Sequence, residues 1–161
     1  MRVATIGVYG FTGGSFGAAL RDAGVRRVVD VRQRRGVRGS EYAWANSRRL
    51  QAMLADAGVD YLHEPGLAPT TELRQLQYAE DDRRGVGRRS RVELAPEYER
   101  RYAAEILSGF DLARFASELP EEELAGLLCV ERDPEACHRS LIADALAREH
   151  GASVVHLRPP M

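Results

Sequence analysis

The segment CVERDPEACHRS, residues 129–140, gathers the side chains most able to do chemistry in this 161-residue chain. It contains both cysteines of the chain. A thiol at a helix N-terminus is a candidate nucleophile, because the helix dipole and a nearby arginine lower its pKa. Cys137 takes that position if DPEA forms a tight turn, whereas a helix that begins at Asp133 places Cys137 in its second turn. Nucleophile and packing residue are therefore equal interpretations of Cys137.

Three neighbours of Cys137 are candidates for acid–base chemistry and anion binding. Glu131 and His138 could each exchange a proton with a ligand. Consecutive helical residues point in different directions, so the Cys137–His138 dipeptide does not by itself predict a nucleophile–base pair. Arg139, close to the expected helix start, is a natural anion ligand. Its alternative is an ion pair with Glu131 or Asp133.

A zinc site is a competing interpretation of the same segment. Cys129, Cys137, His138 and the distant His63 could supply four ligands. The spacing lacks the paired Cys-x-x-Cys element that identifies zinc sites, so we expect no metal. We also expect no cofactor, because the chain has no Walker loop and GVYGFTGG has the wrong glycine spacing for a dinucleotide site. Cys129, inside an apolar run, is interpreted as a small buried hydrophobe.

Short apolar runs that alternate with helical patterns must position this segment. The expected strands are 2–9, 26–32, 59–64, 124–131 and 153–157. The expected helices are 12–24, 46–58, 72–79, 96–107, 111–119 and 137–151, with a loop at 81–91. This order predicts a single α/β domain over residues 1–161, with a mostly parallel five-stranded sheet flanked by helices.

Ligands of open α/β sheets bind beyond the carboxyl ends of the strands. The residues at those ends are Tyr9 to Thr12, Asp30 to Arg32, His63 and Glu64, and 129–139. The segment with both cysteines therefore falls where such a sheet places its site. Asp30 joins Glu131 as a candidate base.

The basic residues have an unusual composition and distribution. All 23 are arginines, and they cluster in RQRRGVRG (32–39) and RRGVGRRSR (83–91). A GC-rich genome explains the absence of lysine, and a charged run is often only a solvated loop. Two such loops still favour an anionic ligand. The candidate anion-binding residues are Tyr9, Thr12, Arg32, Arg35, Arg38, Arg88, Arg89 and Arg139.

Overall composition limits the class of protein. The net charge is −1 and 44% of residues are hydrophobic, which is typical of a soluble domain. No apolar run approaches the roughly 18 residues of a membrane span, and MRVATIGVYG does not resemble a signal peptide. Two cysteines make no disulfide framework. We therefore expect a cytoplasmic protein with no membrane partner, while the sequence does not indicate an oligomeric state.

Several stretches resemble one known family. TIG, VVDVR, LADAGVDYLHEPGLAP and above all LLCVERDPEACHRSLIADAL are similar to the domain of unknown function 488 family, and its Arg-rich branch matches the loops. Members more commonly carry His at the position of Val8, and QRRG replaces their Pro-containing stretch. The resemblance implies an α/β fold with a polar pocket. It marks Asp30, Arg32, Cys129, Glu131, Cys137, His138 and Arg139, and it supplies no reaction.

Three functions follow as hypotheses. The first is a small enzyme, a hydrolase or transferase, acting on a nucleotide or on nucleic acid. Arg32 and Arg139 would hold the phosphate, and Glu131 or Asp30 would be the base, or the charge that stabilises a developing cation.

The second hypothesis is a non-catalytic nucleic-acid-binding module. Its arginine loops would follow the phosphates, and Tyr42 and Trp44 would stack on bases. The pI of about 6.4 counts against it, because dedicated binders are usually basic. The third hypothesis is a thiol redox or sulfur-handling protein that uses Cys129 and Cys137.

Overall fold

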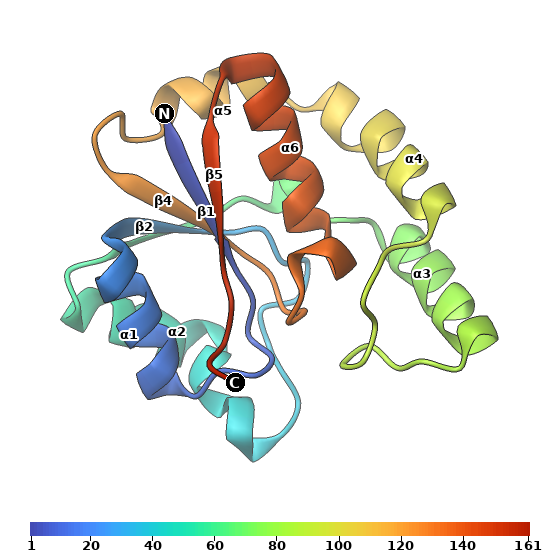
Figure 1. Ribbon diagram of the computed structural model, residues 1–161, viewed down its shortest axis with the longest axis horizontal. Coiled ribbons are helices and arrows are strands. Elements are labelled where there is room, and N and C mark those ends of the chain that lie inside the picture. The colour runs from blue at the N-terminus through green and yellow to red at the C-terminus, as the bar shows by residue number, and fades with distance from the viewer.

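The computed structural model describes residues 1–161 as five strands, six α-helices and four short 3-10 helices (Figure 1). The strands are β1 (Arg2–Ile6), β2 (Val25–Asp30), β3 (Asp60–His63), β4 (Leu124–Leu128) and β5 (Ser153–Leu157). The helices are α1 (Gly13–Ala23), α2 (Ser47–Asp56), α3 (Thr71–Arg84), α4 (Pro96–Glu105), α5 (Leu112–Glu118) and α6 (His138–His150). The predicted α/β class is confirmed.

The strands form one sheet in the order β3-β2-β4-β1-β5, and every pair is parallel. Strand β4 lies at the centre, and all five of its residues are buried. That burial agrees with its continuous apolar sequence, as expected for a strand covered on both faces. All five carboxyl ends point to the same edge of the sheet.

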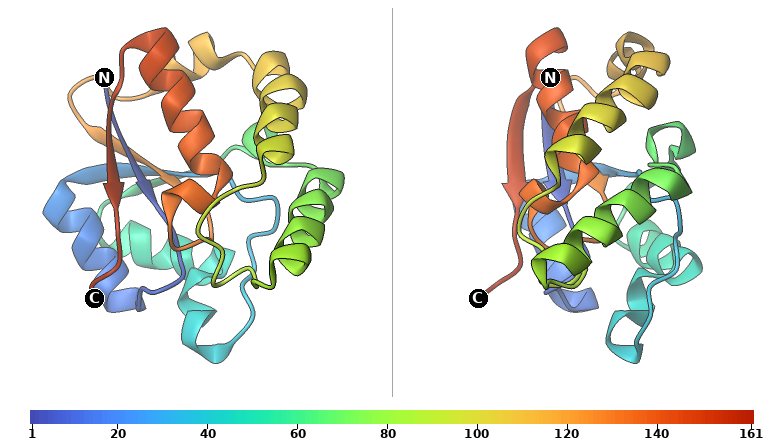
Figure 2. Two further views of the ribbon diagram at one scale, coloured as in Figure 1. Left: turned by 45° about the vertical axis from the view of Figure 1, so that its right-hand side comes forward. Right: turned by 90° about the vertical axis from the view of Figure 1, so that its right-hand side faces the viewer.

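Two hydrophobic cores cover the two faces of the sheet. One packs α1 and α2, through Phe16 and Leu50, against the face that carries Ile6. The other packs α3, α4, α5 and α6 against the opposite face, which carries Val3. Adjacent strand residues therefore serve different cores, because side chains alternate across a strand. Figure 2 shows α3 and α4 side by side at the outer end of the second layer.

Several predicted boundaries are wrong. Strand β4 ends at Leu128, so Cys129 and Glu131 follow the strand instead of lying in it. Helix α3 continues to Arg84 and takes in the first residues of the expected loop 81–91. It ends there because Gly85 adopts φ 72°, a conformation that glycine accommodates without steric strain. No helix is long and apolar enough to cross a bilayer.

The first helix begins as predicted. The Thr12 side chain accepts a hydrogen bond from the backbone N–H of Ser15, and the Ser15 side chain caps in return. Thr12 is therefore a helix cap, which accounts for this residue without a ligand. Thr12 lines neither of the two arginine-rich cavities, so the structure gives no support to its predicted role in anion binding.

Candidate functional site

Cys137 is the N-cap residue of α6. Pro134–Ala136 form a single 3-10 turn, and regular helix begins only at His138. The tight-turn interpretation of DPEA is therefore confirmed, and a helix beginning at Asp133 is wrong. Cys137 has extended backbone angles, φ −142° and ψ 147°. Because Cys137 is not itself helical, its side chain need not point away from that of His138, as consecutive helical residues would.

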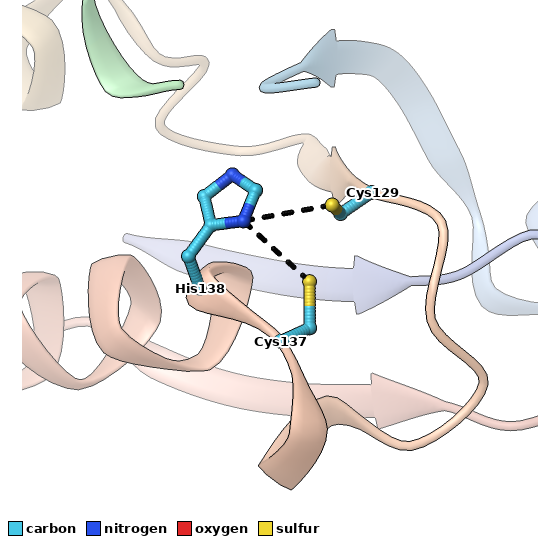
Figure 3. A group of neighbouring side chains, drawn as sticks. All are labelled: Cys129, Cys137 and His138. Carbon is cyan, nitrogen blue, oxygen red and sulfur yellow. Dashed lines mark hydrogen bonds between the residues drawn. The ribbon is translucent and has the colours of Figure 1, made fainter. Parts of the chain in front are cut away.

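Both thiols approach the same nitrogen of His138. The Nδ1 atom lies 3.6 Å from Sγ of Cys129 and 3.7 Å from Sγ of Cys137 (Figure 3). The three side chains come from the end of β4 and the start of α6, and all three are buried. The dipeptide alone did not predict a Cys137–His138 pair, and the structure brings the two side chains together.

A backbone carbonyl fixes the orientation of the His138 ring. Nε2 lies 2.9 Å from the carbonyl oxygen of Val31, just past the end of β2. A carbonyl only accepts, so Nε2 must carry the hydrogen and donate. In the neutral ring Nδ1 then holds a lone pair, and that lone pair faces the two sulfurs.

The two thiols differ in acidity because of what surrounds each. Burial raises the pKa of Cys129 well above its usual value, and the neighbouring Cys137 raises it further. Burial acts the same way on Cys137, but the neighbouring Cys129 side chain and the charges of Arg139 and His138 hold its pKa well below the usual value. The pair therefore loses its first proton readily, and the helix N-terminus favours Cys137 as the thiolate.

Glu131 closes the cluster on the side of the arginines. The thiol of Cys129 donates to its Oε2 over 3.4 Å, and its Oε1 lies 3.2 Å from Nε of Arg88 and 3.6 Å from Nη1 of Arg91. Burial alone would raise the pKa of Glu131, but Arg88 and Arg91 lower it to about 2. Glu131 is therefore ionised at neutral pH.

Asp30 and Arg32 form a buried ion pair instead of a binding site. Nε and Nη2 of Arg32 donate to the two carboxylate oxygens of Asp30, each over 2.8 Å, and Nη1 donates to the carbonyl of Ala45. The hydroxyl of Tyr61 also donates to Asp30. Both carboxylate oxygens of Asp30 are occupied, and Arg32 uses all three side-chain nitrogens in these contacts, although it also lines the small cavity next to the cluster. The geometry therefore supports neither the base role of Asp30 nor the phosphate role of Arg32.

Arginines line two adjoining cavities above the cluster. The inner cavity, of about 40 Å³, reaches Cys129, Glu131, Cys137 and His138. The outer cavity, of about 640 Å³, is lined by Tyr9, Tyr78, Arg34, Arg38, Arg74, Arg88 and Arg89, together with glycine, serine and valine. It has five arginines and no acidic side chain in its wall, although the whole chain carries a net charge of −1. Such a wall attracts anions.

The predicted anion-binding residues divide into two groups. Arg38, Arg88, Arg89 and Tyr9 line the outer cavity. Arg35 instead donates to the hydroxyl of Tyr61.

A family model described as "Domain of unknown function DUF488" matches residues 14–146. The chain belongs to this family. The resemblance noted in the sequence is therefore confirmed. No curated protein and no solved structure matches the chain.

Three pocket arginines of this DUF488 chain were not predicted as ligand-binding residues. Arg34 lies within the first arginine cluster and Arg91 within the second, but nothing in their spacing distinguished them from their neighbours. Arg74 lies on α3, four residues before Tyr78, so both side chains share one helical face. That four-residue spacing between an arginine and a tyrosine is the sequence feature that could have pointed to Arg74.

Arg139 is an internal residue of the DUF488 chain. It is fully buried, and it donates from Nη1 to the carbonyl of Glu131 and from Nη2 to that of Arg132, over 2.7 and 3.1 Å. It forms neither an ion pair with a neighbouring carboxylate nor a wall of either cavity. The expected role as an anion ligand is replaced by one in holding the loop after β4.

We expect Arg139→Met to destabilise the protein by about 2–5 kcal/mol, since each buried carbonyl left without a donor costs roughly 1–3 kcal/mol. Urea unfolding measures this change. Arg148→Ala, on the exposed side of the same helix, is the control and should change stability by less than about 0.5 kcal/mol. Equal stability of the two variants would contradict the internal role.

Proposed function

We propose that this DUF488 protein is a small cytoplasmic enzyme, a hydrolase or transferase, that binds a phosphorylated, nucleotide-like ligand. The observation that carries the proposal is the arginine wall of the outer cavity, which adjoins a buried thiol, imidazole and carboxylate. Guanidinium groups recognise phosphate through pairs of parallel N–H donors.

Unoccupied donors in the wall support this binding role. The side chains of Arg34 and Arg38 donate no intramolecular hydrogen bond, and Arg88 uses only Nε, toward Glu131. Arg74 is partly engaged, because Nη1 donates to Oε1 of Gln33 and Nη2 donates to the hydroxyl of Tyr78. The outer cavity falls within the roughly 300–1,000 Å³ of small-molecule sites.

The cluster supplies the groups that would react. The phosphoryl end would approach Arg88, and the inner cavity leads from there to Cys137 and Glu131. Cys137 is the candidate nucleophile of the metal-free protein, with His138 as its proton partner 3.7 Å away. Glu131, already ionised, favours a cationic or proton-donating group nearby.

The positions of the aromatic residues favour a small ligand over a nucleic-acid strand. The ring of Trp44 packs against Phe16, with ring centres 4.9 Å apart, and the ring of Tyr42 is covered by Arg89. Each ring already has a partner inside the protein, which counts against the base stacking that the nucleic-acid-binding hypothesis requires. One observation favours the thiol redox hypothesis, because the sulfurs of Cys129 and Cys137 lie within 4.8 Å of each other.

Calorimetric titration with pyrophosphate, a nucleoside triphosphate and the matching unphosphorylated nucleoside tests the proposal. We expect the phosphorylated probes alone to bind, and Arg34→Ala and Arg74→Ala each to weaken binding by about tenfold or more, as for lost charged hydrogen bonds of about 1.5–3 kcal/mol. Arg114→Ala, at an exposed ion pair on α5, is the matched control.

Two results would overturn the proposal. One is the absence of binding by any phosphorylated probe, and the other is equal binding by the wall variants and the control. Affinity for polymers alone, falling steeply with salt, would support the nucleic-acid-binding module instead.

A further inference from the structure

We propose that Cys129, Cys137 and His138 bind one thiophilic divalent metal ion, Zn²⁺ by ligand chemistry, with its fourth coordination position open to the inner cavity. The three ligand atoms converge within 4.8 Å of one another although no Cys-x-x-Cys element brings them together in sequence. Two thiolates and an imidazole are the donors that zinc prefers over oxygen-binding cations.

The distances agree with a tetrahedron. Zinc–sulfur bonds of about 2.3 Å and zinc–nitrogen bonds of about 2.0–2.1 Å give a sulfur–nitrogen edge of about 3.6 Å at tetrahedral angles. The two edges that end at Nδ1 of His138 measure 3.6 and 3.7 Å. The third edge, between the two sulfurs, is about 3.8 Å in such a tetrahedron, and the sulfurs here lie within 4.8 Å of each other, so an ion would at most draw the two thiols together.

The ring orientation of His138 is a second, independent indication. Metal-binding histidines almost always donate their other ring N–H to a carboxylate, a carbonyl or water, which directs the free lone pair at the ion. Nε2 of His138 donates in this way to the carbonyl of Val31 over 2.9 Å. Nδ1 therefore needs no reorientation to become a ligand.

Charge balance also favours an ion in this buried site. Two thiolates neutralise the charge of Zn²⁺, and binding releases whatever protons the two thiols and the imidazole still hold. Glu131 keeps its pairing with Arg88 and Arg91, so its own charge is already balanced and does not compete for the ion. The inner cavity of about 40 Å³ has room for an outside ligand such as water.

The inference deepens the proposed function without depending on it. A bound ion would make Cys137 a metal ligand, so Cys137 would no longer be the candidate nucleophile. A site with three protein ligands and one open position is the arrangement of catalytic zinc, whereas structural zinc has four protein ligands. The metal would instead activate a water molecule at the open position, and this water would be the nucleophile toward the phosphorylated ligand.

Cobalt substitution of the full-length protein tests the metal site. Chelator-treated protein titrated with Co²⁺ should develop thiolate-to-cobalt charge-transfer absorption and the intense visible bands of tetrahedral cobalt, saturating at one ion per chain. Zn²⁺ should displace the cobalt and remove the bands. Elemental analysis after dialysis against Zn²⁺ should give the same stoichiometry.

Variants assign the ligands. Cys129→Ser and Cys137→Ser should each weaken binding by more than the 10–100-fold that is typical of losing an outer-shell contact. His63→Gln is the control and should bind like the wild type, because His63 lies at the end of β3, where its Nε2 contacts the carbonyl of Arg32. Circular dichroism of each metal-free variant separates lost ligands from lost folding.

Thiol alkylation keeps the test independent of the variants. In the wild type, Zn²⁺ should protect both cysteines from iodoacetamide, and a chelator should restore their reaction. Cobalt spectra without a thiolate band, or alkylation unchanged by Zn²⁺, would overturn the metal site. Titration of the metal-free protein with pyrophosphate measures the proposed anion binding separately, so either proposal can fail alone.

Discussion

Replacing Arg32 by methionine is expected to lower the free energy of unfolding by about 3–5 kcal/mol, the range for breaking a buried ion pair by removing one partner. The carboxylate of Asp30 is fully buried, and it would keep only the hydroxyl of Tyr61 and a backbone N–H as donors. The carbonyl of Ala45 would also lose its donor. Methionine approximately fills the space, so the loss reflects charge and hydrogen bonding.

Urea unfolding at neutral pH measures this effect. Arg114→Ala is the control, because its ion pair with Glu118 is exposed and such pairs contribute roughly 0.3–0.5 kcal/mol. If Arg32 were held for a ligand and not for the fold, its loss would leave stability nearly unchanged. A decrease below about 1 kcal/mol would therefore contradict the structural role.

Gly7→Ala is expected to destabilise the protein by about 3 kcal/mol, the upper end of the usual effect of overpacking. A Cβ atom at Gly7 would lie 1.9 Å from the carbonyl oxygen of Glu131 and 3.2 Å from Nη2 of Arg139. The first of these is backbone, so the loop after β4 would have to move. That loop carries Cys129 and Glu131, and the metal-binding or thiol chemistry should weaken together with stability.

Gly17→Ala is the matched control for this variant. Gly17 lies inside α1, and a Cβ atom there meets no atom within 4 Å. Alanine should therefore stabilise the helix by about 0.5–1 kcal/mol. Thermal and urea unfolding of both variants give the comparison, and a Gly7→Ala protein as stable as the wild type would show that the loop adapts freely.

The strands were predictable because apolar runs and turn residues alternate regularly along the chain. The continuous apolar sequence of Leu124–Leu128 also indicated a strand covered on both faces. The sheet order was not predictable, because it depends on which distant strands pair. The inserted position of β4 between β1 and β2 follows from tertiary packing and has no local signal.

The site was predictable in its location but not in its internal geometry. The approach of Cys137 to His138 depends on the extended backbone of the single residue Cys137. The roles of the arginines were the weakest prediction, because a guanidinium group can donate either to a phosphate or to a backbone carbonyl. Arg139 donates to backbone carbonyls in the loop after β4, and no sequence pattern indicates which acceptor will lie nearest to an arginine.

The central place of β4 has a consequence for synthesis of the chain. Strands β1 and β2 are each paired with β4 and not with each other, so a nascent chain cannot join them before Leu124–Leu128 has left the ribosome. Until then β1 has no partner, and its unpaired backbone is open to aggregation. Both cysteines follow β4 in the chain, Cys129 immediately and Cys137 at the start of α6. Their thiols therefore emerge only after the strand that joins β1 to β2 has been synthesised.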